Sequence, residues 1–255
     1  MWTIDLNADL GEGYGPWTMG DDAAMLSIVS SANVACGGHA SDPDTMARTL
    51  QLAKARGVVT GAHPSYPDKE GFGRRRLAMA PAEIERFVAA QIGALIAIGR
   101  LVGQPIHYVK PHGALANVAA EEAPVAEAIV RAVHAVDPRL AILAISGTVL
   151  EQVARARGLA VFSEIFADRG YTPRGLLVPR NEPGAMIHDP ETALQRLLGF
   201  FQNRRMPAVG GDPVTLAADS VCIHGDSPDA VAMARHIRSG FTARGLGIAP
   251  FLARG

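Results

Sequence analysis

Short apolar runs rich in β-branched residues alternate along the chain with longer segments of helical period. Such runs predict strands, because a strand that is buried on both faces needs apolar side chains along most of its length. The segments between them repeat apolar residues at three- and four-residue spacing, which is typical of helices that bury one face. The predicted strands are Thr3–Ala8, Ser31–Ala35, Val58–His63, Ile106–Lys110, Leu140–Ile145, Ala160–Phe166 and Ser220–His224.

The helical segments show both a buried face and a repeated way of starting. Three starts combine a capping residue, a proline and an acid, which suits the first turn of a helix: Asp42-Pro43-Asp44, Asp189-Pro190-Glu191 and Ser227-Pro228-Asp229. A further helix is predicted from Pro81, with one apolar face made of Ile84, Phe87, Val88, Ile92, Leu95 and Ile96. Strands that alternate with helices in this way predict a parallel sheet with right-handed crossovers.

Polar residues follow nearly every predicted strand. An open doubly wound sheet gathers its ligands at one switch point, so most of its strand ends need no such residues. A barrel instead places functional groups at the carboxyl ends of all its strands. We therefore predict one seven-stranded (β/α) barrel that forms a single domain over residues 1–255. The strand-end residues are Asp9, Glu12, His39, His63, Lys110, His112, Ser146, Thr148, Asp168, Arg169, His224 and Asp226.

The spacing of these residues supports a common site. Alternate residues of a strand share a face, and Asp5, Asn7 and Asp9 keep that spacing in the first strand. The same holds for Glu164 and Asp168 in the sixth. A single histidine in a strand is more often a core residue than a catalyst. Here, however, a purely structural role would have to apply independently to the polar residues at most strand ends, so their convergence favours a common site. Residues interpreted as structural, surface or simply buried are His107, His134, His188, His236, Cys36 and Cys222.

Two loops carry candidate binding residues. The first spaces Gly11, Gly13 and Gly15 after the first strand, so that backbone amides can approach an anion. It lacks the spacing of a dinucleotide fingerprint, and the chain has no P-loop motif. The second covers residues 64–79 and is long for a compact barrel, which predicts a lid or binding loop. Its Arg74 and Arg75 can clamp a carboxylate or phosphate, or they can lie on a solvated face.

Composition narrows the function classes. The chain has 255 residues, of which 48% are hydrophobic and 19% charged, so it can bury a sizeable core. A net charge of −1 gives no support for nucleic-acid or membrane-surface binding. No apolar run approaches the length of a membrane span, and the N-terminus shows no basic and apolar leader. We therefore expect a cytoplasmic protein.

Seven segments from Asp5 to Asp226 together closely resemble the LamB/YcsF family. The resemblance implies a barrel of the glycoside hydrolase/deacetylase type. It also implies an activity, the ATP-dependent opening of 5-oxoproline to L-glutamate, carried out together with the 5-oxoprolinase subunits B and C. The segments are DLNADLGEGYG, SANVACGGHASDP, GAHPSYPDKEGFGRR, VKPHGAL, EIFADRGY, LLVPR and CIHGD.

Three residues depart from the family pattern. Gly38 stands where the family often has an aromatic residue, Ser41 where it often has glycine, and Ala116 where it has tyrosine. These differences bear on the shape of the substrate and not on the class of reaction.

The implied chemistry assigns roles to the candidates. Phosphorylation of a lactam oxygen by ATP requires cations for the phosphoryl charge and a base for water. Lys110 is interpreted as the group that stabilises a phosphate or a developing oxyanion. The structural alternative is that it pairs with a barrel carboxylate such as Glu164. If the lysine acts on the substrate, we expect Lys110→Met to change stability little. His63 and His112 are the candidate general acid and base, and Asp9 is the fourth catalytic candidate.

The remaining candidates are assigned to binding. Asp9 and Glu12 suit the Mg²⁺ that accompanies the nucleotide, because Mg²⁺ prefers carboxylate oxygens. Arg169, with Arg74 and Arg75, is expected to bind the substrate carboxylate. The position of ATP stays open. Other residues assigned to substrate or nucleotide are Asn7, Gly11, Gly13, His39, Glu164, Asp168, His224 and Asp226.

Two other functions fit the same residues. In a metal-dependent deacetylase, Asp5, His39, His63 and His112 would supply the ligands. The H-x-x-x-H spacing expected of such enzymes is absent, since His107 and His112 are five positions apart. The chain can also be a non-catalytic subunit that binds a substrate or a partner.

Overall fold

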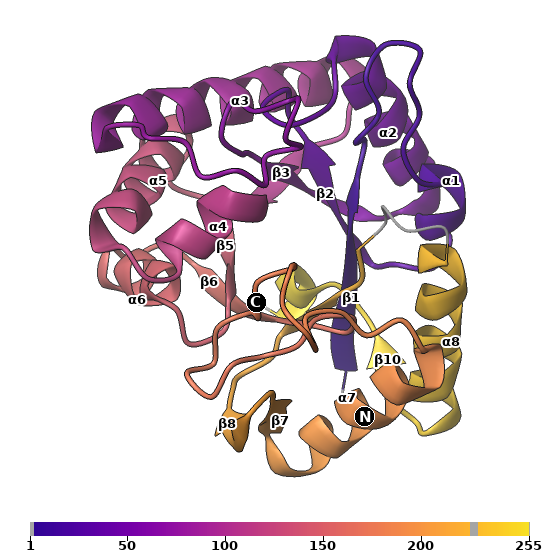
Figure 1. Ribbon diagram of the computed structural model, residues 1–255. Helices are drawn as coiled ribbons and strands as arrows, with labels where there is room; N and C mark the ends of the chain where they lie inside the picture. Colours follow the sequence, from indigo (N-terminus) through magenta and orange to yellow (C-terminus); the bar gives the residue numbers. More distant parts are fainter. Residues whose placement is uncertain (1–2, 225–228, 255) are drawn as a thin grey trace.

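A closed barrel of seven parallel strands forms the centre of the protein (Figure 1), in a computed structural model that describes residues 3–224 and 229–254. The pairing of β9 with β1 closes the ring. This closure confirms the seven-stranded barrel predicted from the strand ends. In spatial order the strands are β1 (Thr3–Leu10), β2 (Ser31–Ala35), β3 (Val59–His63), β4 (Ile106–Val109), β5 (Ala141–Ile145), β6 (Val161–Phe166) and β9 (Ser220–Cys222).

Three short strands were not predicted. β7 (Arg205–Ala208) and β8 (Gly211–Thr215) form an antiparallel hairpin, and β10 (Gly247–Ile248) pairs with the start of β1. The hairpin is largely exposed and holds a proline in each strand, so it lacks the apolar run that marks a buried strand. Two-residue β10 is too short for any periodicity.

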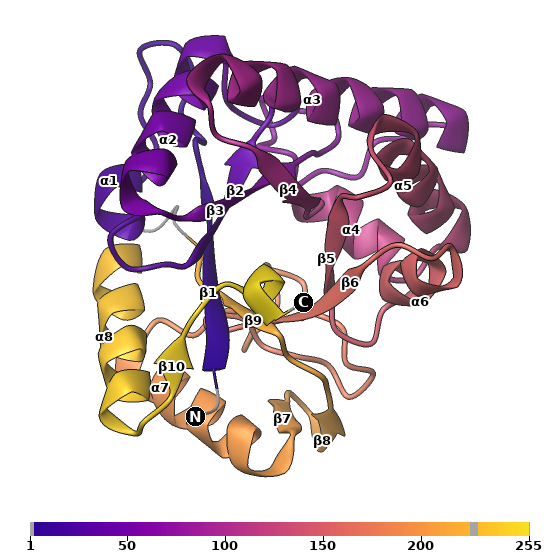
Figure 2. The same cartoon turned by 180° about the vertical axis from the view of Figure 1, so that it is seen from behind.

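Helices surround the barrel in both views (Figures 1 and 2). Asp42 caps α2 by accepting from Thr45 N at 3.0 Å, and Asp189 caps α7 by accepting from Thr192 N at 2.8 Å. Both caps agree with the sequence; Ser227 and Pro228 of the third predicted cap lie outside the described residues. The helices are α1 (Asp22–Met25), α2 (Pro43–Arg56), α3 (Pro81–Val102), α4 (Gly113–Ala119), α5 (Ala123–Val136), α6 (Val149–Ala156), α7 (Pro190–Asn203), α8 (Ala230–Ala243) and the 3₁₀ helix η1 (Phe251–Arg254).

The buried face of α3 differs from the predicted one in one residue. Phe87 is 44% exposed, so its assignment to the buried face was wrong. It lies at the edge of the apolar stripe, and Gln91 lies within the stripe instead. The Gln91 side chain accepts from Ser65 N and donates to Ser65 O, which satisfies its buried amide. Neither α3 nor any other helix of the described chain has the length and apolarity needed to cross a membrane.

The barrel interior is apolar where the strands begin. The Phe251 ring of η1 lies 5.0 Å from the Tyr108 ring and 4.7 Å from the Phe162 ring, centroid to centroid. Figure 2 shows η1 against this end of the barrel. Gly61 faces the same space, and a Cβ there would lie 2.3 Å from the Tyr108 ring. The rings of Tyr108, Phe162 and Phe251 form an aromatic plug, and their packing requires glycine at position 61.

Polar side chains fill the barrel beyond this plug. Asp5 accepts from the Ser31 hydroxyl at 2.7 Å and also from Ser220, while Asn7 Nδ2 donates to Glu164 at 2.9 Å. These bonds join β1 to β2, β6 and β9 across the interior. They confirm that Asp5 and Asn7 share the inward face that their spacing predicted.

We predict that Asp5 makes stability depend on pH. Burial, partly offset by serine hydroxyl bonds, raises the pKa of Asp5 from 3.8 to about 6. The folded protein therefore holds this proton more tightly than the unfolded chain. The free energy of unfolding should fall by roughly 3 kcal/mol as the pH rises through this interval. Asp5→Asn should remove that component, as measured by urea unfolding of both proteins between pH 4 and 7.5.

The difference between the two unfolding curves isolates Asp5 from other titrating groups. A difference that does not change with pH would show that Asp5 is ionised to the same extent in the folded and unfolded chains.

Candidate active site

A cavity of about 490 Å³ lies at the carboxyl ends of the strands. Its lining includes residues from β1, β3, β5 and β6, Lys110 directly after β4, and parts of residues 111–121 and 176–181. The second of these segments belongs to the loop that passes in front of the barrel in Figure 1. Asp9, His63, Lys110 and Glu164 lie among the lining residues, so the cavity collects candidates from separate strands.

Lys110 lies at the centre of this polar group. Its Nζ is 3.0 Å from Asp9 Oδ1, 2.9 Å from Glu164 Oε1, 3.2 Å from Asn7 Oδ1 and 3.0 Å from Cys222 Sγ. Burial acts to lower the pKa of Lys110, but Asp9, Cys222 and Glu164 together raise it well above its usual value. The lysine is therefore charged, and the pairing with Glu164 that the structural alternative required is present.

The two carboxylates beside Lys110 differ in their tendency to hold a proton. Burial acts to raise the pKa of Asp9, yet His63 and Lys110 bring it well below the usual value. Burial outweighs Lys110 at Glu164 and raises its pKa. Glu164 Oε2 is also buried without a hydrogen-bond partner among the described residues. Of the two carboxyl groups, Glu164 therefore has the greater tendency to take up a proton, whereas Asp9 stays ionised.

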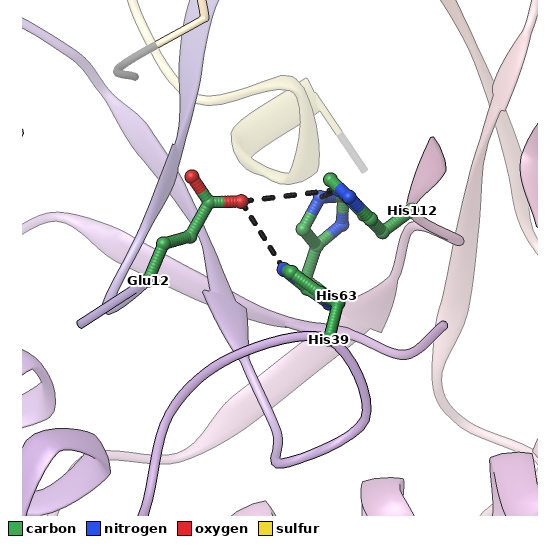
Figure 3. A group of neighbouring side chains, drawn as sticks. All are labelled: Glu12, His39, His63 and His112. Carbon is green, nitrogen blue, oxygen red and sulfur yellow. Dashed lines mark hydrogen bonds and ion pairs between the residues drawn. The ribbon is translucent and has the colours of Figure 1, made fainter. Parts of the chain in front are cut away.

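Three histidines and Glu12 form a buried cluster beside this group (Figure 3). His39 Nε2 lies 3.1 Å from Glu12 Oε1, and His112 Nδ1 lies 3.0 Å from His63 Nε2. The His39 and His112 rings stack with centroids 3.7 Å apart. Burial lowers the pKa of His39 to about 3 and that of His112 well below its usual value, so both rings are neutral.

Asp5 does not join these histidines. Its carboxylate accepts from Ser30, Ser31 and Ser220, at the level of the barrel below Asn7. The carboxylate within the cluster is that of Glu12. Of the four ligands expected for a deacetylase, Asp5 is therefore wrong, and Glu12 is the carboxylate that lies beside the three histidines.

The loop of residues 64–79 separates the two candidate arginines. Arg74 lines the cavity. Arg75 Nε donates to Asp68 Oδ1 at 3.0 Å, and Arg75 is not among the lining residues. Phe72 O accepts from His112 Nε2 at 2.9 Å, so the loop also contacts the histidine cluster.

The glycine loop after β1 lies apart from the cavity. Gly11 N donates to Asp22 Oδ2 at 3.0 Å, and a Cβ at Gly13 would lie 2.8 Å from Trp17 O. Neither glycine lines the cavity. The bond from the Gly11 amide to a carboxylate explains the first glycine, and close packing against the backbone explains Gly13. Neither glycine needs the bound anion that the sequence suggested.

Arg169 and Asp168 hold the loop after β6. Arg169 Nε donates to Ala185 O at 3.1 Å and its Nη2 donates to Val178 O at 2.6 Å. Burial and the nearby Arg180 lower the pKa of Arg169 to about 10. Asp168 pairs with His224 at 2.8 Å. Arg169 and His224 line the cavity, whereas Asp226 lies outside the described residues.

Several lining residues had not been singled out from the sequence. Arg180 and Asn181 come from the loop after β6, and Asn117 and Glu121 come from α4 and the turn after it. Two signals pointed to the loop: the LLVPR segment contains Arg180, and residues 167–189 show neither strand nor helix period over an unusual length.

The sequence profile of the LamB/YcsF family matches residues 4–254. The chain belongs to the LamB/YcsF family. The resemblance drawn from the sequence segments is thereby confirmed over nearly the whole chain.

Relatives of this LamB/YcsF chain match it along nearly their full length. A protein of Pseudomonas syringae pv. tomato, named as a 5-oxoprolinase A subunit, is 50% identical, covering 100% of this chain and 99% of the relative. The 5-oxoprolinase A subunit of Gluconobacter oxydans is 51% identical, covering 96% and 97%. The crystal structure of a lactam utilization protein from Thermus thermophilus superposes with a TM-score of 0.91 at 44% identity, covering 97% of this chain and 99% of that one.

The three departures from the family pattern have different settings. Ala116 lines the cavity, so a tyrosine there would change its shape. Gly38 does not line the cavity, and a Cβ on it would lie 2.2 Å from Gln91 Oε1. Ser41 has a φ of 76°, the left-handed conformation that explains glycine elsewhere in the family. The structure therefore links substrate shape to Ala116 alone among the three.

The ion pairs of Lys110 change the expectation for Lys110→Met. This variant leaves Asp9 and Glu164 buried without their cation, which should lower the free energy of unfolding by about 3–5 kcal/mol. Lys54→Met is the matched control, because Lys54 donates to Val102 O at an exposed position. It should change stability by less than about 0.5 kcal/mol. Chemical unfolding of both variants checks this prediction, and equally small effects would contradict it.

Proposed function

We propose that this LamB/YcsF chain is the A subunit of an ATP-dependent 5-oxoprolinase. In this proposal, 5-oxoproline is opened to L-glutamate in the cavity, coupled to ATP hydrolysis, with subunits B and C as partners. The observation that carries the proposal is the charged Lys110 between two carboxyl groups of opposed proton affinity at a cavity of about 490 Å³. The names and full-length identity of the relatives support the same substrate class.

The reaction divides into steps that the residues can serve. Transfer of a phosphoryl group from ATP to the lactam oxygen releases ADP and activates the ring carbon. Water then adds to this carbon, and the adduct breaks its carbon–nitrogen bond as the departing nitrogen takes up a proton, which leaves an acyl phosphate. A second water hydrolyses the acyl phosphate to L-glutamate and phosphate. Lys110 stabilises negative charge at the oxygen, and Glu164 supplies the proton. Asp9 keeps Lys110 charged throughout.

Cations around the cavity suit the substrate carboxylate. Arg74, Arg169 and Arg180 all line it. Two donor groups of Arg169 already hold the loop after β6. We assign the substrate carboxylate to Arg74 and Arg180 because a guanidinium group matches the geometry of a carboxylate, and we assign to Arg169 the role of holding the wall in place.

The nucleotide is proposed to depend on the partner subunits. ATP enters as co-substrate with Mg²⁺, for which Asp9 and Glu12 were the sequence candidates. Asp9 is paired with Lys110 and Glu12 with His39, and the glycine loop lies away from the cavity. Subunits B and C are therefore expected to contribute most of the nucleotide site.

Reconstitution tests the proposal directly. The chain alone should form little or no glutamate from 5-oxoproline and ATP, whereas the complex with subunits B and C should form it with stoichiometric ADP. Robust ATP-coupled turnover by the chain alone would remove the requirement for partners. A complete complex without turnover would overturn the proposed activity and favour a binding subunit.

Glu164→Gln tests the proton donor within that complex. Glutamine keeps an oxygen for Lys110 but cannot donate the proton, so turnover should fall by about 100-fold or more with little change in KM. Glu85→Gln on the surface of α3 is the matched control and should retain normal turnover, because Glu85 pairs with Arg131 away from the cavity. Near-normal turnover of Glu164→Gln would show that another group delivers the proton.

A further inference from the structure

We propose that Glu12, His39, His63 and His112 bind one divalent transition-metal ion of the zinc type. The four side chains converge in Figure 3, and their potential ligand atoms all lie within 4.8 Å of one another. The proposal concerns metal binding and does not rest on the lactam chemistry. It gives His63 and His112 a different role from the acid–base one expected from the sequence.

Backbone carbonyls fix the tautomers of two of the histidines. His63 Nδ1 lies 2.7 Å from Lys110 O, and His112 Nε2 lies 2.9 Å from Phe72 O. A carbonyl oxygen only accepts, so each of these nitrogens carries the hydrogen. In a neutral imidazole the other nitrogen then bears a lone pair. Those nitrogens are His63 Nε2 and His112 Nδ1.

These two lone pairs face each other. His63 Nε2 and His112 Nδ1 are 3.0 Å apart, and two acceptors at that distance repel unless a cation lies between them or beside them. A metal ion satisfies both lone pairs at once.

The remaining two groups complete a ligand set. Glu12 Oε1 lies 3.1 Å from His39 Nε2 and 3.8 Å from His112 Nδ1. Because a carboxylate only accepts, His39 Nε2 donates to Glu12 when no ion is bound, while His39 Nδ1 has no hydrogen-bond partner among the described residues. An ion at the cluster would take the place of this hydrogen and leave the hydrogen on Nδ1, so that Nε2 presents a lone pair to the metal beside the Glu12 carboxylate.

The spacing suits tetrahedral coordination. Zinc bonds of about 2.0–2.1 Å place neighbouring ligand atoms of a tetrahedron about 3.3 Å apart. The separations of 3.0, 3.1 and 3.8 Å lie around that value. The carbonyl bonds to His63 and His112 are the outer contacts that orient ligating imidazoles in metal sites. Three imidazoles and one carboxylate favour zinc or a similar ion over Mg²⁺.

The ligands come from the ends of four consecutive barrel strands. Glu12 follows β1, His39 follows β2, His63 ends β3 and His112 follows β4. Four protein ligands fill a tetrahedral shell, which is the arrangement of a site that stabilises structure. A bound ion would therefore tie these strand ends together beside the cavity, with Asp9 Oδ2 3.4 Å from His63 Nε2 as a nearby counter-charge.

Metal titration of the untagged wild-type chain tests the site. After treatment with a chelator, the protein should bind one zinc ion per chain, measured by elemental mass spectrometry. Zinc should raise the melting temperature, whereas the same concentration of Mg²⁺ should not. Absence of stoichiometric zinc binding, or equal shifts with both ions, would overturn the proposal.

Variants locate the ion. His39→Ala and Glu12→Gln should each weaken zinc binding at least about tenfold, since even outer contacts of a metal site contribute that much. His134→Ala on the exposed face of α5 is the matched control and should bind zinc normally. Unchanged zinc affinity in both ligand variants would place the ion elsewhere and overturn the proposal. The readout is binding, so a failed turnover assay and a failed metal site remain distinguishable, and the wild-type titration decides if a variant does not fold.

Discussion

The ion pairs of Lys110 with Asp9 and Glu164 are the constraint on which the centre of the barrel depends. Three ionisable groups are buried together at distances of 2.9–3.0 Å, where an uncompensated charge is costly. The groups come from β1, from the end of β4 and from β6, so the compensation exists only when the barrel is closed. Fold and site electrostatics are therefore specified by the same contacts.

The layers of the barrel follow from this constraint. Aromatic rings around Phe251 fill the end where the strands begin, and polar groups occupy the carboxyl end. Asp9 belongs to two neighbourhoods, since its Oδ1 pairs with Lys110 and its Oδ2 lies 3.4 Å from His63 Nε2. A change in charge at the histidine cluster therefore changes the electrostatic environment of Lys110 at the cavity. This shared carboxylate links the proposed lactam chemistry to the proposed metal site.

Sequence patterns anticipated the features that depend on periodicity. The seven barrel strands, the inward face of Asp5 and Asn7, and the caps at Asp42 and Asp189 all follow from spacing along one element. The gathering of Lys110 with Glu164 was foreseen as an alternative, because the carboxyl ends of the strands meet in a barrel.

The parts that sequence could not supply depend on which partner a side chain finds in space. Arg75 bonds to Asp68, and the amide of Gly11 bonds to Asp22, although neither contact is visible as a spacing rule. Glu12, not Asp5, joins the histidines, because the loop after β1 turns its carboxylate toward them. The loop after β6 has no periodic signature, so only the structure shows that Arg180 of this loop lines the cavity.

The most direct test of the account is a crystal structure of the assembled complex with 5-oxoproline. The account predicts the lactam within the cavity, its oxygen toward Lys110 and its nitrogen toward Glu164 Oε2, with the substrate carboxylate near Arg74 or Arg180. Substrate bound in another subunit, with this cavity empty at saturating concentration, would contradict the central claim that ring opening takes place in this barrel.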